Sequence, residues 1–416
     1  MQYPSRFEGL PEYAFPRLRR LLEGIAPGGP EVAMSLGEPQ HAVPDFVGPI
    51  MLEHSGKLSK YPPNEGLAEL REAISDWLAR RYGVAEAYRD PDTNILPLNG
   101  TREGLFNSCI ALSPEEKSGK RPAVLLPNPF YQCYAVAALT AGAEPVYLPC
   151  TAETGHLPDF AGLPAELLDR TTVAYICSPA NPQGAVADRD YWETLLTLAE
   201  RHDFMIFADE CYCEIYRDAP PVGALQVAAE IGADPERLVI FHSLSKRSNL
   251  AGLRSGFACT GAGNRARMLQ LRSYAGAPLP IPAQIAAAAC WRDETHVTEN
   301  RSRYRHKFAI ADEILSNLPG YMSPTAGFFL WLRVQDGEEA ARVLWRETGV
   351  KALPGAFLAR ETAPEFSGNS RGGNPGRAYL RLALVAPADE VRSGLTALRE
   401  ILLRDAGQDG GGMIEA

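Results

Sequence analysis

Hydrophobic and polar positions follow two distinct patterns along most of the chain. Residues 67–82 (LAELREAISDWLARRY) place apolar side chains mostly three or four positions apart, which is typical of an amphipathic helix. Between such helical segments lie short apolar runs of strand length, at residues 123–126, 146–148, 173–176, 205–207, 238–241 and 256–259. Strands that alternate with helices predict an α/β fold, with a mostly parallel sheet covered by helices on both faces.

The pattern changes from about residue 293 onward. A long helical segment leads to an apolar run, a second helical segment and a second apolar run, at residues 297–318, 327–334, 337–348 and 379–385. This order predicts a smaller α+β domain. The N-terminal part is rich in Pro and Gly and resembles an arm. We therefore expect an arm that also joins the small domain, a large domain and a small C-terminal domain, at residues 1–45, 46–290 and 291–416.

The composition excludes several classes of protein. The 416 residues are 45% hydrophobic, and 51 acidic against 41 basic residues give a formal net charge of −10. Such a chain is unsuited to binding nucleic acid or an anionic membrane surface. No stretch reaches the ~20 apolar residues of a membrane span, and the N-terminus lacks the apolar core of a signal peptide. The eight cysteines are scattered without a CxxC pair, so we expect no metal site and reduced thiols in a cytoplasmic protein.

Polar side chains follow several of the predicted strands at the point where each strand ends. Residues 178–184 (SPANPQG) follow one run, residues 208–212 (ADECY) follow the next, and residues 243–246 (SLSK) follow a third, with Arg254 eight residues later. A fourth polar segment, residues 99–102 (NGTR), precedes a helix. Because the carboxyl ends of parallel strands meet at one edge of a sheet, we expect these segments to converge there.

One group of these residues suits a flat ring that carries a reactive carbonyl. Lys246, partly desolvated and near an arginine, would have a lowered pKa and could form an imine. Asp209 could hold a proton on a ring nitrogen, while Asn181 and Tyr212 could donate hydrogen bonds to a phenolate oxygen. Tyr131 offers a flat face that could stack on the ring.

A second group suits a phosphate. The start of a predicted helix offers free backbone N–H groups and the positive end of the helix dipole at Gly100, Thr101 and Arg102. Further contacts could come from Ser243, Ser245 and Arg254. Each motif alone has an ordinary structural explanation, because NPxG is a common turn and Asp209-Glu210 can cap a helix. Their joint occurrence in this order is what indicates a site.

Together the motifs resemble the class I/II aminotransferases of fold type I, which use pyridoxal 5′-phosphate. The resemblance extends from Gly37 to Arg381, and its motifs are Tyr61 with Gly66, residues 99–102, 129–131, 181–184, 209–212 and 243–246 with Arg254, and Arg381. It implies that Lys246 carries the cofactor and acts in catalysis with Asp209 and Tyr212. It also implies that Arg381 grips the substrate α-carboxylate, with Gly37 and Asn181 beside it. The family further implies a homodimer with shared active sites, in which Tyr61 reaches the partner subunit's phosphate.

A narrower resemblance is to the succinyldiaminopimelate transaminases of bacterial lysine biosynthesis. It rests on SLGEPQH, LNGTREGLF, NPFYQCY, SPANPQGAV, DECYCEIY, SLSKRSNLAGLRSGF, ALPGAFLAR and YLRLALV, with residues 246–249 the most telling part. It implies that glutamate gives an amino group to N-succinyl-2-amino-6-oxopimelate. Both acids carry a distal carboxylate, for which Arg272 is a candidate contact, although a solvated arginine at a helix end explains Arg272 equally well. Gln183 departs from the common Thr, and residues 364–376 form an extended Gly/Ser-rich loop.

Three alternatives remain at this point. A carbon–sulfur lyase, or an aspartate or aromatic aminotransferase, would use the same lysine and aspartate. A non-catalytic regulator on the same fold would need an attached DNA-binding domain, and the N-terminal residues do not have a helix-turn-helix pattern. A Rossmann-type dehydrogenase would need a G-x-G-x-x-G segment after the first strand, and none is present there.

Overall fold

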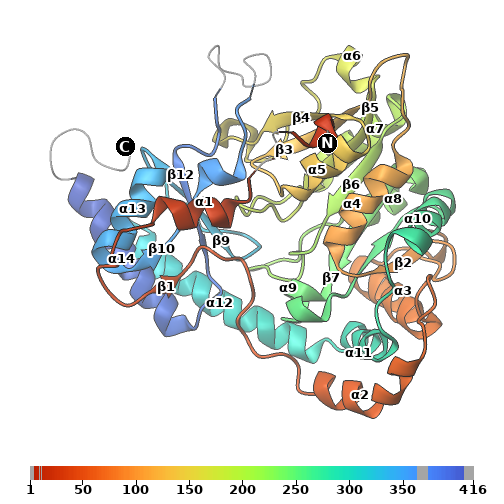
Figure 1. The fold of residues 1–416 in the computed structure, drawn as a ribbon, viewed down its shortest axis with the longest axis horizontal. Coiled ribbons are helices and arrows are strands. Elements are labelled where there is room, and N and C mark those ends of the chain that lie inside the picture. The colour runs from red at the N-terminus through yellow and green to blue at the C-terminus, as the bar shows by residue number, and fades with distance from the viewer. Residues whose placement is uncertain (1–3, 9, 11, 363–372, 407–416) are drawn as a thin grey trace.

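A computed structural model describes residues 4–8, 10, 12–362 and 373–406 (Figure 1). Its main sheet has seven strands in the order β2-β8-β7-β6-β5-β3-β4. Neighbouring strands from β7 to β4 are parallel, whereas β8 is antiparallel to both β7 and β2. The predicted α/β fold is confirmed. The strands are β2 (Ile95–Leu98), β3 (Ala123–Asn128), β4 (Glu144–Pro149), β5 (Thr171–Cys177), β6 (Met205–Asp209), β7 (Leu238–Ser243) and β8 (Gly256–Cys259).

The central strands are buried along their whole length, which explains why they appear in the sequence as continuous apolar runs. Every residue of β3, β5 and β7 is buried. A parallel sheet needs cover on both faces, and two hydrophobic clusters supply it. One cluster includes α3 (Ala68–Tyr82), α7 (Arg189–Arg201), α8 (Ala224–Ile231) and α11 (Ile281–Arg292), and the other includes α4 (Thr101–Leu112), α5 (Cys133–Thr140) and α10 (Ala262–Ala275).

A second, smaller sheet lies in the C-terminal part of the chain. Three antiparallel strands pair in the order β11-β12-β9, and a separate parallel pair joins β1 near the N-terminus to β10. The N-terminal helix α1 packs against β11, so this helix takes part in the same unit. The elements are α1 (Ala14–Leu21), β1 (Val32–Ala33), β9 (Phe329–Arg333), α13 (Gly337–Thr348), β10 (Val350–Lys351), β11 (Leu353–Pro354), β12 (Tyr379–Ala383) and α14 (Ala388–Ala406).

The long helix α12 (Thr295–Leu315) connects the surroundings of the two sheets. In Figure 1 it runs from the neighbourhood of α9 (Leu244–Arg247) and α11 towards α14, against which it packs. Two short helices complete the set, α2 (Val47–Glu53) against α11 and α6 (Ala165–Leu168) before β5. Within the described ranges, no helix is both long and apolar enough to cross a membrane. Most of the predicted loop at residues 364–376 lies outside them.

Gly104 shows how closely α4 packs on the sheet. A Cβ atom at this position would lie 2.4 Å from Cδ1 of Leu98 and 2.9 Å from Cε1 of Phe241, both of which are buried. We therefore expect Gly104→Ala to lower the free energy of unfolding by about 1–3 kcal/mol through overpacking. Thermal melts of the purified variant measure the effect. Gly48→Ala in α2 is the matched control, because nothing lies within 4 Å of its added Cβ, and an equal loss there would contradict the explanation.

Candidate active site

The predicted polar segments meet around one cavity of about 380 Å³ at the carboxyl edge of the main sheet. Residues from the ends of β5, β6 and β7 line it, together with the start of α4 and residues of β9 and β12 in the smaller sheet. The site residues predicted from the sequence that line this cavity are Gly37, Thr101, Arg102, Tyr131, Asn181, Asp209, Tyr212, Ser243, Ser245, Lys246, Arg254 and Arg381. The geometry therefore unites side chains that are up to about three hundred positions apart in the sequence.

Lys246 lies on α9, immediately after β7. Its Nζ donates a hydrogen bond of 2.5 Å to the carbonyl oxygen of Gly37 and lies 5.9 Å from the centre of the Tyr212 ring. Burial lowers the pKa of Lys246 below its usual range, with Arg381 adding to this effect. A lowered pKa increases the share of neutral amine, which is the form that attacks a carbonyl or accepts a proton.

Asp209 ends β6 on the floor of the cavity. Its side chain accepts a hydrogen bond of 2.8 Å from the Tyr134 hydroxyl and a longer one of 3.4 Å from the backbone N–H of Cys211. Burial raises the pKa of Asp209, while these hydrogen bonds and the charge of Lys246 oppose the rise. No cationic side chain in the described part of the chain forms an ion pair with Asp209, and a buried carboxylate of this kind is suited to a ligand that brings a positive charge, such as a protonated ring nitrogen.

The start of α4 forms a cradle for an anion. Gly100 precedes the helix with a φ of 85°, and a Cβ there would lie 2.3 Å from Nη2 of Arg254. Only glycine therefore lets this guanidinium approach the helix start, where unpaired N–H groups point outward. Arg254 itself has a φ of 59°, a conformation that is costly for a residue other than glycine and concentrates at functional sites. The Ser243 hydroxyl accepts from the Ser245 N–H at 2.9 Å, which fixes both serines at the same edge.

Arg381 presents a buried positive charge to the cavity from β12. Its guanidinium donates to the Asn181 side chain at 3.0 Å and to the Ser35 carbonyl at 2.7 Å, and it lies 4.5 Å from the centre of the Phe329 ring. Burial lowers the pKa of Arg381 to about 10. Among the described residues it has no carboxylate partner, and its Nε has no hydrogen-bond acceptor. A ligand carboxylate would supply the opposite charge and could accept a hydrogen bond from Nε.

Gly37 is needed where the chain passes this arginine. A Cβ at Gly37 would lie 2.6 Å from Cζ of Phe329, so a larger residue would displace that ring. The same residue offers its carbonyl oxygen to Lys246. Segment 35–37 therefore contacts both the lysine and the arginine through backbone oxygens, which no sequence motif reveals.

Three predicted residues do not line the cavity. Gly100 lies directly before Thr101, which does line it. Tyr61 is fully exposed in the single chain, so its predicted role across a dimer remains a prediction. Arg272 requires a correction. Its side chain is buried on α10, where it pairs with Glu103 at 2.9 Å and donates to the Asn64 carbonyl at 2.6 Å. Because Glu103 already neutralises it, Arg272 is neither the solvated arginine nor the free cation that the sequence suggested.

The residues around the cavity fit pyridoxal phosphate in each part of that molecule. The Asp209 carboxylate would suit a protonated ring nitrogen, the α4 start with Arg254 would suit a phosphate, and Lys246 provides an amine. Tyr134 was missed in the sequence, although it stands three positions after Tyr131, one turn along the same segment. Its hydroxyl is the nearest donor to Asp209.

Comparison with known proteins agrees with this geometry. The family model for aminotransferase class I and II matches residues 32–366. An LL-diaminopimelate aminotransferase from Dehalococcoides mccartyi is 30% identical over 410 residues, covering 96% of this chain and 98% of that protein. A crystal structure of an aminotransferase from Neisseria meningitidis superposes with a TM-score of 0.88 at 38% identity and covers 95% of this chain and 99% of that one. Another, aminotransferase AspB from Helicobacter pylori, has a TM-score of 0.84 at 29% identity and covers 96% and 99%.

The match extends over most of the chain and includes every segment that lines the cavity except α1 and β12. The relatives and the solved structures span nearly their full length on this chain. The chain therefore belongs to the class I and II aminotransferases, a family of fold type I that depends on pyridoxal 5′-phosphate.

Proposed function

We propose that this aminotransferase serves the formation of diaminopimelate, moving an amino group from glutamate to N-succinyl-2-amino-6-oxopimelate. The products are 2-oxoglutarate and N-succinyl-LL-2,6-diaminopimelate, and the reaction is reversible. The sequence segments that resemble succinyldiaminopimelate transaminases support the succinylated acceptor. The relatives named LL-diaminopimelate aminotransferase support the same carbon skeleton without the succinyl group, which makes free LL-diaminopimelate the second candidate. We place the reaction in the cytoplasm, where thiols such as those of its eight cysteines stay reduced.

The unpaired guanidinium of Arg381 is the observation that carries the proposal of an amino-acid substrate. Its position beside Asn181 fits an α-carboxylate, which it would bind with two parallel hydrogen bonds. A carboxylate held there directs the substrate Cα towards the centre of the cavity, where the Lys246 amine lies. The same contact discriminates against amines that lack the carboxylate.

The cofactor supplies an aldehyde that condenses with amines and a protonated ring that withdraws electrons from the substrate Cα. We assign its ring-nitrogen proton to Asp209, its phenolate oxygen to Asn181 and Tyr212, and the face of its ring to Tyr131. Its phosphate would be held by Gly100, Thr101, Ser243, Ser245 and Arg254. Once the Lys246 amine is free, its Nζ takes the proton from the substrate Cα and later returns it, as general base and then general acid.

The distal carboxylate requires a second cation, because a buried carboxylate without a partner is costly. We assign this contact to the side chain of Arg102, which lines the cavity while the phosphate cradle uses the backbone at the same position. Its guanidinium contacts the hydroxyl of Tyr131 and lies 3.3 Å from that of Tyr13, and no carboxylate of the described residues pairs with it. Arg102 also lines a second, neighbouring pocket, which leaves room for an extended acceptor.

We further propose a homodimer in which each active site is completed by the partner subunit's Tyr61. The fully exposed phenol of Tyr61 is the feature that supports this, because an aromatic side chain of this size gains from being covered. Leu52, Leu58 and Tyr274 are also strongly exposed apolar residues that a second copy could cover.

The proposed role of Lys246 has a direct test. Lys246→Ala should abolish turnover, because no other group in the cavity can replace the amine. Borohydride reduction of the holoenzyme followed by peptide mapping should place the cofactor on Lys246. Lys120→Ala removes an exposed lysine that lies before β3, at the end of that strand away from the cavity, and should leave turnover unchanged. A reduced cofactor attached to any other lysine would exclude the assignment.

Shared active sites predict complementation between an impaired variant and an inactive one. Tyr61→Ala should lower kcat/KM by about tenfold or more through loss of a phosphate contact. When it is mixed and refolded with Lys246→Ala, hybrid dimers should contain one site without either substitution and regain activity. If Tyr61 served its own chain, every site would carry one substitution and the mixture would show no more than the residual activity of Tyr61→Ala. Sedimentation of wild-type protein as an active monomer would contradict the proposal outright.

Acceptor choice tests the substrate. Glutamate-coupled assays should show the succinylated acceptor used far better than pyruvate, and glutamate preferred to tyrosine. Arg102→Gln should lower kcat/KM for the succinylated acceptor by about 100-fold and alanine–pyruvate exchange far less, because only the long acids need the distal contact. Arg292→Gln removes the same charge from an exposed ion pair with Glu69 and serves as the control.

The panel also separates the alternatives. Preference for LL-diaminopimelate with 2-oxoglutarate would favour the unsuccinylated substrate, and preference for tyrosine or phenylalanine would favour an aromatic aminotransferase. Release of pyruvate from a thioether amino acid would indicate a carbon–sulfur lyase. A protein that binds the cofactor but turns over no donor would be the non-catalytic regulator.

A further inference from the structure

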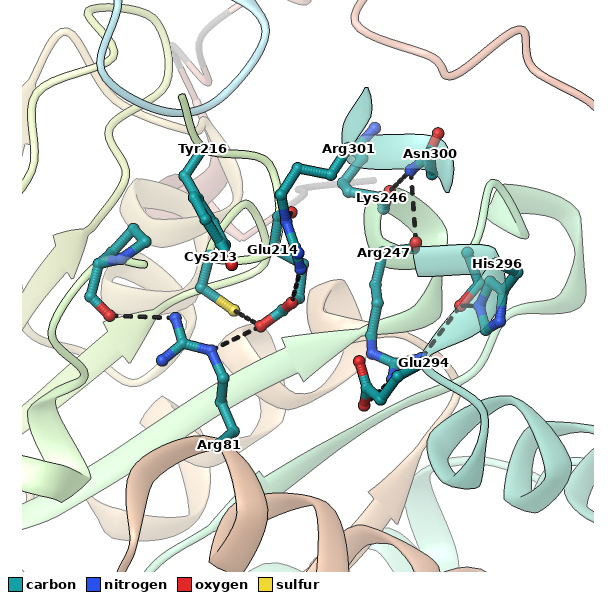
Figure 2. Close-up of polar contacts among 12 residues, drawn as sticks. Arg81, Cys213, Glu214, Tyr216, Lys246, Arg247, Glu294, His296, Asn300 and Arg301 are labelled. Carbon is teal, nitrogen blue, oxygen red and sulfur yellow. Dashed lines mark hydrogen bonds and ion pairs between the residues drawn. The ribbon is translucent and has the colours of Figure 1, made fainter. Parts of the chain in front are cut away.

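The first turns of α12 contact the segment that bears Lys246 and the loop at Glu214, which follows β6 (Figure 2). Asn300 donates hydrogen bonds to the backbone carbonyls of Lys246 at 3.3 Å and of Arg247 at 3.4 Å. The adjacent Arg301 donates to both the backbone and the side chain of Glu214, five residues after Asp209. One helix therefore contacts both the helix of Lys246 and the loop that follows Asp209.

Asn300 is buried and uses every hydrogen-bonding position of its amide. Its two N–H groups serve the carbonyls on α9, and its oxygen accepts from Nδ1 of His41 at 2.8 Å and from the side chain of Asn249 at 3.1 Å. Rotating the amide by 180° would place its oxygen against two carbonyls and its N–H groups against the Asn249 amide. The orientation is therefore fixed, and His41 must carry its proton on Nδ1.

This tautomer of His41 leaves Nε2 as an acceptor, and Lys307 occupies it. The Lys307 Nζ lies 2.8 Å from His41 Nε2 and 3.0 Å from the Val385 carbonyl, in a position that is almost fully buried. The donors thus run in one direction, from Lys307 through His41 and Asn300 to the carbonyl of Lys246. We refer to Lys307, His41 and Asn300 as the donor relay.

The protonation states of Lys307 and His41 agree with the direction in which the donor relay donates. Burial lowers the pKa of Lys307 to about 8, with a further contribution from Arg303 on the same helix, and burial also lowers the pKa of His41 to about 4. Near neutral pH the lysine is therefore the charged donor and the histidine the neutral intermediate. The ring of Tyr304 lies 5.2 Å from Lys307 Nζ, and among the described residues no carboxylate forms an ion pair with that amine.

The donor relay joins three parts of the active site. His41 stands four residues after Gly37, whose carbonyl accepts from the Lys246 amine, and Val385 stands four residues after Arg381. We propose that Asn300 is a positioning residue for Lys246, and that the relay behind it keeps the lysine-bearing helix in register with the Gly37 segment and β12. The positioning role rests on the proposed role of Lys246. It also gives a purpose to Asn249 in the run at residues 246–249, because the Asn249 side chain donates to the Asn300 oxygen.

The substitution Asn300→Asp tests the proposal with almost no change in shape. The carboxylate can accept from His41 and Asn249 but cannot donate to the two carbonyls on α9. We expect kcat for transamination to fall by about 30-fold or more while KM for glutamate changes less than about threefold, because Arg381 and Asn181 are untouched. We also expect the midpoint of the visible-absorbance pH titration of the holoenzyme, which reports the ionisation of the lysine-bound cofactor, to rise by about half a unit or more, since a negative charge is placed nearby.

Asn94→Asp is the matched control. Asn94 is equally buried, donates to the Thr260 carbonyl at 2.8 Å and accepts from the Asp90 N–H at 3.0 Å, but it lies at the end of β2 away from Gly100. It should lower the melting temperature without moving the titration midpoint. A wild-type midpoint and kcat in folded Asn300→Asp would overturn the proposal, and so would the same changes in Asn94→Asp.

A second pair of variants tests the donor relay at a half-buried position that tolerates substitution more readily. His41→Gln can still accept from Lys307 and donate to Asn300, whereas His41→Leu can do neither. Recovery of the titration midpoint and kcat in His41→Gln, with loss in His41→Leu, is the expected result, and equal behaviour of both variants would overturn the relay. Borohydride mapping on wild-type protein separates the positioning role of Asn300 from the proposal that Lys246 carries the cofactor. If the label lies on Lys246 and Asn300→Asp behaves as wild type, only the positioning role fails.

Discussion

Burial of charge around a single cavity is the constraint on which the rest of the structure depends. Lys246, Asp209 and Arg381 face the same 380 Å³ space, and burial is the largest cause of the pKa shift of each. Removing a charge from water is expensive unless polar groups replace the lost hydration. Here the replacements are neutral: a tyrosine hydroxyl for the carboxylate, and backbone carbonyls for the lysine and the arginine. None of these partners neutralises the charged group, so each charge remains available to a ligand group of opposite charge.

This arrangement explains why the site draws on both sheets. The main sheet supplies the ends of β6 and β7 with Asp209 and the residues that lead to Lys246, and the smaller sheet supplies Arg381 on β12. Segment 35–37 lies between them and contributes only backbone oxygens to the charged side chains. A carbonyl satisfies an ammonium or guanidinium group without neutralising it. If an acidic side chain took the place of either carbonyl, it would neutralise Lys246 or Arg381. That positive charge would then no longer be available to the substrate.

The strands that are buried throughout, and the polar residues that follow them, could be predicted from the sequence. A buried strand appears as a continuous apolar run, and the polar residues directly follow that run. The runs at 173–176 and 238–241 lie inside β5 and β7, and the segment at 337–348 coincides with α13. The short β2, with a proline inside it, was not recognised, and α12 ends three residues before the predicted boundary. Arg272 was misjudged because its partner, Glu103, is distant in the sequence. The contacts of Asn300 and His41 depend on side-chain orientation across helices, for which a single sequence holds no pattern.

The pairing of β1 with β10 has a consequence for how the molecule is made. Val32 pairs with Val350, and α1 packs against β11, so these two elements are synthesised long before the strands that they contact. The main sheet, by contrast, is complete once β8 has emerged. Synthesis therefore produces an α/β core while Leu18 and Met34 still lack the C-terminal residues that help to bury them. During that interval these apolar residues are surfaces for a chaperone to cover, and closure of the smaller sheet is the step that withdraws them.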